Sequence, residues 1–118
     1  MLSLLSEIAE QIETIKKSMQ YDILNPELKV LIELYLEREK GLHVNELARR
    51  LRGKLSKATV QKALMRLDDQ TLVKTQIGTV RIGGADHLAK ICQVSGETTI
   101  HYIENLIKAI YYTLQPNK

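Results

Sequence analysis

The chain has 118 residues, a formal net charge of +3 and a single cysteine, Cys92. This length favours one domain with one hydrophobic core, and a lone cysteine excludes an internal disulfide framework and suits a reducing compartment. We therefore expect a single domain over residues 1–118 in the cytoplasm. The N-terminal segment lacks a secretory signal pattern, and no apolar run approaches the ~18 residues of a membrane span, so no membrane contact is expected.

The positive charge is concentrated in the middle of the chain. Residues 40–81 carry ten Lys or Arg against three acids, a net charge of +7. Residues 1–39 carry four basic and eight acidic side chains, a net charge of −4, and residues 82–118 carry three of each. A basic block of this kind is typical of a surface that lies on nucleic acid, which the total charge alone does not indicate.

The first two predicted elements are helices. Apolar residues three and four positions apart predict an amphipathic helix from about residue 2 to residue 21. Its apolar stripe consists of Leu5, Ile8, Ile12, Ile15 and Met19. Asn25 is a suitable N-cap and Pro26 a suitable first residue for a second helix, which we expect to end at Gly41. Apolar residues cover most of the circumference of this second helix, which predicts a central position in the core.

A helix-turn-helix pattern follows. Residues 42–44 are short and extended, and Asn45 is placed to cap a third helix over residues 46–52. After a turn that contains glycine, Ser56 caps a fourth helix over residues 57–70. One face of this fourth helix is apolar, and the opposite polar face has no evident partner in the chain.

A hairpin and a last helix complete the pattern. Residues 72–77 are predicted as a strand, and nearby glycines mark a hairpin tip over residues 79–85. Residues 89–94 are expected to form the return strand, with a short helix as the alternative. A final helix is predicted over residues 98–115. It carries a second apolar stripe, Ile100, Ile103, Ile107, Ile110 and Leu114.

The order of these elements is that of a winged-helix domain, an α+β and mostly helical fold. The segment VNELARRLRGKLSKATVQKALMRLDDQTLVK resembles the core of winged-helix transcription regulators of the MarR type and related small archaeal and bacterial families. The likeness covers residues 26–96, and its most specific part is LSKATVQKALMRL followed by LVK. The segment ADHLAKICQVSGE is similar to the end of a MarR-type wing. The resemblance implies a homodimeric, sequence-specific regulator of transcription whose helices over residues 1–22 and 98–115 serve dimerisation.

Three features depart from this family pattern. Thr71 stands where these families usually place a Gly after the recognition helix. Leu88 stands two residues after the Asp of the wing, where the family has an arginine. The wing is also several residues longer than usual. These differences favour the winged-helix superfamily over one particular subfamily.

The resemblance places the helix over residues 57–69 in the major groove of double-stranded DNA, and the wing over residues 74–90 on the backbone or minor groove. Side chains near the start of such a recognition helix reach base edges, where amides and lysines pair with adenine and guanine. The predicted base contacts are Ser56, Lys57, Thr59, Gln61, Lys62 and Met65. The predicted phosphate contacts, which position the protein without distinguishing bases, are Arg49, Arg50, Arg52, Lys54, Arg66, Lys74 and Arg81.

The two apolar stripes of the terminal helices are the predicted homodimer interface. One module makes few phosphate contacts, and salt weakens each of them, so a single copy is expected to bind DNA loosely. Two copies on half-sites about 34–36 Å apart overcome this weakness. The alternative is that the two stripes pack on each other, or on the second helix, within one chain.

Other functions have weaker support in the sequence. Phosphate-binding loops, catalytic-triad spacing and paired carboxylates are absent, so we predict neither an enzyme nor a cofactor. His101 and Glu104 share a helical face, but such a pair is more often a surface contact than a metal site. Five tyrosines permit a small-molecule effector pocket without requiring one. The main alternative is a winged helix used as a protein-interaction module, and RNA binding is a third reading that the absence of Phe and Trp disfavours.

Overall fold

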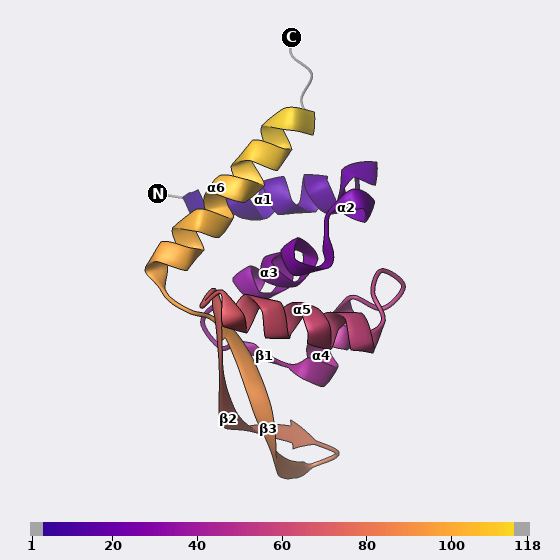
Figure 1. Ribbon diagram of the computed structural model, residues 1–118, viewed down its shortest axis with the longest axis vertical. Coiled ribbons are helices and arrows are strands. Elements are labelled where there is room, and N and C mark those ends of the chain that lie inside the picture. Colours follow the sequence, from indigo (N-terminus) through magenta and orange to yellow (C-terminus); the bar gives the residue numbers. More distant parts are fainter. Residues whose placement is uncertain (1–3, 115–118) are drawn as a thin grey trace.

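The computed structural model describes residues 4–114, and within the first helix it describes side chains from Glu7 onward. Strands pair antiparallel in the order β1-β3-β2. Helices α4 and α5 form a helix-turn-helix and β2 and β3 form a wing, so the predicted winged helix-turn-helix, α+β and mostly helical, is confirmed (Figure 1). The elements are α1 (Leu4–Lys16), α2 (Met19–Ile23), α3 (Pro26–Leu36), β1 (Leu42–His43), α4 (Val44–Arg50), α5 (Lys57–Asp69), β2 (Val73–Ile82), β3 (Ala85–Val94) and α6 (Glu97–Leu114).

The molecule is elongated, with extents of 52 × 33 × 30 Å. The wing projects from one end, α1 and α6 cross at the other, and α3 and α5 lie between them (Figure 1). All seven side chains from Lys29 to Tyr35 of α3 are buried, and this helix contacts α4, α5, α6 and β3. The predicted central position of this helix is therefore confirmed.

Two predicted helix caps are confirmed. The Asn25 side chain accepts a hydrogen bond from the backbone N–H of Leu28 at 2.8 Å, with Pro26 at the first position of α3. The Ser56 hydroxyl accepts one from the backbone N–H of Thr59 at 3.1 Å and starts α5. Each bond satisfies an N–H group that the first turn of a helix leaves without an internal partner.

Two other boundaries differ from the prediction. Helix α3 ends at Leu36, and the chain then turns to Gly41, whose φ of +76° is favourable only for glycine. A Cβ atom at Gly41 would also lie 2.7 Å from the carbonyl oxygen of Cys92 in β3. Helix α4 begins at Val44 with His43 as its N-cap, so Asn45 lies inside the helix and does not cap it.

The prediction of a single N-terminal helix to residue 21 is wrong, because the helix is interrupted between α1 and α2. The backbone at Ser18 is extended, and its hydroxyl donates a hydrogen bond to the carbonyl oxygen of Ile15 at 2.7 Å. A serine side chain that bonds the preceding turn competes with continuation of the helix. Met19 consequently leaves the stripe of α1 and is 85% exposed.

The terminal helices pack on each other within one chain. Helix α1 contacts α6, and five side chains of the two predicted stripes are at most 1% exposed: Ile8, Ile12, Ile15, Ile103 and Ile107. These five have no surface left for a second copy, so the predicted dimer interface is corrected to the intramolecular alternative for them. Ile100, Ile110 and Leu114 pack partly against the same core, and the side chain of Leu5 lies outside the described residues.

The two strands of the wing are longer than predicted, within a hairpin of nearly the predicted extent. Strands β2 and β3 pair without interruption from Val73 opposite Val94 to Ile82 opposite Ala85. The turn is Gly83-Gly84, with φ of +61° and +83°, as a two-residue type I′ turn requires. The predicted tip over residues 79–85 was too wide because most of it lies in the strands, and the short-helix alternative for the return strand is wrong.

Thr71 adopts the left-handed conformation that the family pattern usually assigns to glycine, with φ of +60°. The backbone N–H groups of Thr71 and Leu72 donate to the carbonyl oxygens of Asp68 and Leu67, both at 2.9 Å, and close α5 in a Schellman motif. The Ser95 hydroxyl donates to the carbonyl oxygen of Thr71 at 2.7 Å. The junction between α5 and the wing is thus held by hydrogen bonds despite the unfavourable residue.

Candidate nucleic-acid interface

The outer face of α5 is open to solvent. Its inner face buries Val60, Ala63, Leu64 and Leu67 in the core. Among the predicted base contacts, the exposed side chains are Ser56, Lys57, Gln61, Lys62 and Met65, the last of them 67% exposed. Thr59 is half-buried, and its hydroxyl lies 2.9 Å from that of Ser56, so these two residues mainly build the cap.

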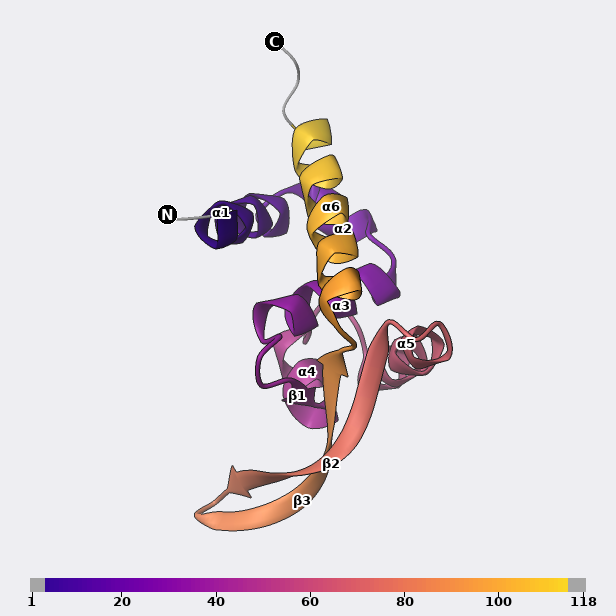
Figure 2. The ribbon, with the colours of Figure 1, turned by 90° about the vertical axis from the view of Figure 1, so that its left-hand side faces the viewer.

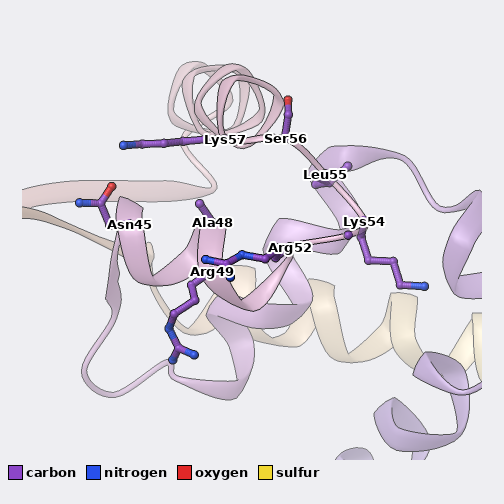
Figure 3. A pocket seen from close by; sticks show the side chains of 9 residues that line it. Asn45, Ala48, Arg49, Arg52, Lys54, Leu55, Ser56 and Lys57 are labelled. Carbon is purple, nitrogen blue, oxygen red and sulfur yellow. The ribbon is translucent and has the colours of Figure 1, made fainter.

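A basic hollow of about 700 Å³ lies beside the start of α5. It opens between α4, the turn that follows it and the first residues of α5, and Figure 3 shows Asn45 and Lys57 on opposite sides of the space. Four of the nine lining side chains are basic, so the hollow concentrates positive charge next to the N-terminus of a helix. The lining residues are Asn45, Ala48, Arg49, Arg52, Gly53, Lys54, Leu55, Ser56 and Lys57.

Two smaller hollows follow along the same side of α5. One of about 160 Å³ shares Asn45 and Lys57 with the basic hollow and adds Gln61 and Lys90. The next, of about 360 Å³, shares Gln61 and Lys90 and reaches Met65. The three hollows therefore form a series from the turn to the base of the wing.

Asn45 and Lys90 were missed as site residues by sequence reasoning. Asn45 was assigned to a helix cap, and Lys90 could be placed only once the register of the hairpin, which sets it opposite Ile77, was known. The basic character of Lys90 was the one available signal. Its position beside α5 depends on tertiary packing.

Several predicted phosphate contacts carry an internal carboxylate partner. Arg49 and Glu46 form a two-bond ion pair within α4. On the wing, Arg81 pairs with Asp86 at 3.2 Å and donates to the carbonyl oxygen of Gly84 at 3.3 Å. Lys54 and Arg66 are also paired, with carboxylates of α2 and α3.

Four predicted contacts are free of such partners. Within residues 4–114, no carboxylate lies within 4 Å of the charged groups of Arg52, Lys57, Lys62 or Lys74. Arg52 and Lys57 line the basic hollow, Lys62 lies on the outer face of α5, and Lys74 is the second residue of β2. The structure thus divides the predicted cations into a free set and a paired set.

Arg50 belongs to an ionic cluster between α3 and α4. Its guanidinium lies 3.0 Å from Glu37, 3.2 Å from Glu46 and 3.9 Å from Glu33. The Glu33 side chain is almost fully buried and also pairs with Lys16 of α1 at 2.6 Å. The phosphate contact of Arg50 stays a prediction, and in the structure the residue joins α3 and α4 through its ion pairs.

Ion pairing keeps the carboxylates of this region charged. A hydrogen bond from Lys54 lowers the pKa of Asp22, one from Arg66 lowers the pKa of Glu27, and one from Arg49 lowers the pKa of Glu46. Because each carboxyl pKa falls below its ordinary value near 4, all three groups are ionised at neutral pH.

The other candidate groups are structural. Burial raises the pKa of the Cys92 thiol, which favours its protonated form. Glu104 accepts a buried hydrogen bond from the Tyr35 hydroxyl at 2.7 Å, with His101 at 3.5 Å from its other oxygen. Across the described part of the chain, no three His, Cys, Asp or Glu residues are grouped to hold a metal ion. None of the helices within residues 4–114 is long and apolar enough to cross a membrane.

Comparisons with known proteins identify the fold. No protein-family model matches the chain, and no curated protein matches it. The structure is similar to the crystal structure of Pex from Synechococcus sp. (strain PCC 7942), with a TM-score of 0.53 and 19% identity over 74% of this chain and 82% of that one. It is also similar to the circadian clock associated protein Pex from Anabaena, with a TM-score of 0.55 and 19% identity over 78% and 84% of the two chains. At this identity the similarity shows a shared fold over most of each chain, and the likeness to the MarR type stays a prediction.

Proposed function

We propose that the chain is a DNA-binding regulator of transcription that acts in the cytoplasm as a homodimer. In this proposal α5 enters the major groove and the wing lies on the backbone or minor groove. The observation that carries the proposal is the uncovered outer face of α5 beside the basic hollow, with Arg52, Lys57 and Lys62 lacking carboxylate partners among the described residues.

The residues divide into two roles under this proposal. Gln61 pairs with adenine and Lys62 donates to guanine, each worth roughly 1–3 kcal/mol of discrimination against a wrong base. Met65 meets a thymine methyl group. Arg52 and Lys74 contact phosphates, which fix the position of the protein without distinguishing bases.

A mobility-shift titration on duplex DNA at several salt concentrations tests the proposal. We expect the logarithm of the affinity to fall linearly with the logarithm of salt concentration, as counterion release requires. Gln61→Ala is expected to change the preferred sequence, because it removes a base contact. Lys17→Ala removes an equal charge from an exposed position directly after α1, a helix that α3 separates from α5 (Figure 1), and serves as the control for Lys62→Ala.

Two outcomes count against the proposal. One is the absence of salt-dependent duplex binding, which supports the alternative of a protein-interaction module, a function that the exposed aliphatic side chains Ile77, Ile82 and Leu88 of the wing favour. The other is a loss of affinity in Lys17→Ala as large as that in Lys62→Ala, because general charge would then explain the binding.

The proposed homodimer would use a smaller apolar surface than the two predicted stripes. With the main stripes buried, the exposed apolar side chains near the terminal helices are Met19 and Ile23 of α2 and Tyr102 and Tyr112 of α6. Sedimentation equilibrium at the protein concentration of the mobility shift is expected to give twice the chain mass. A single-chain mass in both the free and the bound protein would show that one copy binds alone.

A further inference from the structure

Residues 22–27, from the end of α2 to the first turn of α3, hold two cations of the helix-turn-helix. The Lys54 ammonium nitrogen lies 2.6 Å from Oδ1 of Asp22, and Nη1 of Arg66 lies 2.6 Å from Oε2 of Glu27. The partners are 32 and 39 positions apart in the sequence. We call residues 22–27 the acidic strap.

The two cations flank the proposed recognition helix. Lys54 lies in the turn before α5 and lines the basic hollow, and Arg66 lies in the last turn of α5. Their side chains are 44% and 57% exposed, so each remains accessible to an anion from outside. A phosphate that binds either cation must compete with the carboxylate that already holds it.

The backbone of the acidic strap is held in place by its surroundings. The buried Lys29 side chain donates a hydrogen bond to the backbone carbonyl oxygen of Asp22 at 3.2 Å. The ammonium nitrogens of Lys29 and Lys54 both lie 5.7 Å from the centre of the Tyr21 ring, within range of a cation–π contact. Asn25, between the two acids, caps α3. These contacts fix the backbone that carries the two competing carboxylates.

We propose that Asp22 and Glu27 compete with DNA phosphates for Lys54 and Arg66 and thereby lower the affinity and the salt dependence of binding. This inference rests on the proposed DNA binding. A cation neutralised within the protein gains little when a phosphate replaces its carboxylate, because the freed carboxylate then attracts a counterion from solution. A cation without an internal partner adds about 0.9 to the slope of log affinity against log salt.

Asp22→Asn is the direct test. It frees Lys54 and keeps the size of the side chain, so we expect the salt slope on any duplex to steepen by about 0.9. The ratio of the affinity of Asp22→Asn to that of the wild type should therefore be about eight times larger at 0.1 M salt than at 1 M salt. Glu27→Gln is expected to act in the same way through Arg66. A thermal melt of each variant confirms that it is folded.

Two controls separate this effect from net charge and from the proposed function. Glu13→Gln removes the same charge from an exposed position of α1 that has no basic partner within residues 4–114. In Asp22→Asn combined with Lys54→Ala, the gain is expected to disappear. If the wild type binds duplex DNA but Asp22→Asn behaves as Glu13→Gln does, or binds more weakly, the competition is overturned and the DNA-binding proposal stands. If the wild type shows no salt-dependent binding, the proposed function itself fails.

Discussion

Ile107→Ala is expected to lower the free energy of unfolding by about 2–5 kcal/mol. Ile107 is 1% exposed and packs in the core where α1 meets α6, so the truncation removes buried apolar contacts and leaves a cavity. Urea unfolding followed by circular dichroism at two protein concentrations measures the loss. The loss should be equal at both concentrations, because the packing is within one chain.

Met19→Ala is the matched control for this prediction. Met19 belongs to the predicted stripe of the N-terminal helix, the counterpart of the stripe that holds Ile107, but it is largely exposed on α2, and we expect a change within about 0.5 kcal/mol. A substantial and concentration-dependent loss in Met19→Ala, with little effect of Ile107→Ala, would support an interface between copies along the full stripes. Glutamates at positions 12 and 107 should unfold the chain, since each would bury a charge without a partner.

Arg50→Ala is expected to lower stability and Arg52→Ala to weaken DNA binding, although the two residues belong to the same basic run. Removing Arg50 takes the shared partner from Glu33 and Glu37, and should lower the free energy of unfolding by about 1–3 kcal/mol. Removing Arg52 should leave stability unchanged and reduce the salt slope of DNA binding by about 0.9. Thermal unfolding and the mobility-shift titration measure the two effects separately.

Lysine substitutions at the same positions sharpen this comparison. Arg52→Lys keeps a phosphate-binding charge and should retain the salt slope. Arg50→Lys should remain less stable than the wild type, because an ammonium group cannot reproduce the bonds of a guanidinium to several carboxylates. A reduced salt slope in Arg50→Ala with no loss of stability would instead support the predicted phosphate contact of Arg50.

Local chemistry made much of the fold predictable. The caps of Asn25 and Ser56 lie within three residues of the N–H groups that they satisfy, so the sequence alone indicates where α3 and α5 begin. The hairpin of the wing was predicted from an equally local signal, the glycines near its tip. The length of its strands was underestimated because the tip was placed over residues 79–85, whereas the Gly83-Gly84 pair alone forms the turn.

Tertiary relations were less accessible from the sequence. An apolar stripe shows that a helix face must be buried, but it does not identify the covering element, so α1 packing on α6 and pairing between copies were both open. The same limit applies to the candidate site. Ten basic residues over 40–81 indicated a cationic surface, but the acids that neutralise Lys54 and Arg66 are supplied by the acidic N-terminal third. Only the fold separates free cations from paired ones.

The curvature of the wing couples two positions across the hairpin. Figure 2 shows the curved hairpin of β2 and β3. A Cβ atom at Gly78 would lie 2.7 Å from Cγ1 of Ile91. Evolution can therefore enlarge one of these residues only by shrinking the other or by straightening the strands. In an alignment of chains that keep this bend, positions 78 and 91 should covary in volume, and that covariation would mark wings of the same shape among sequences too divergent to align by identity.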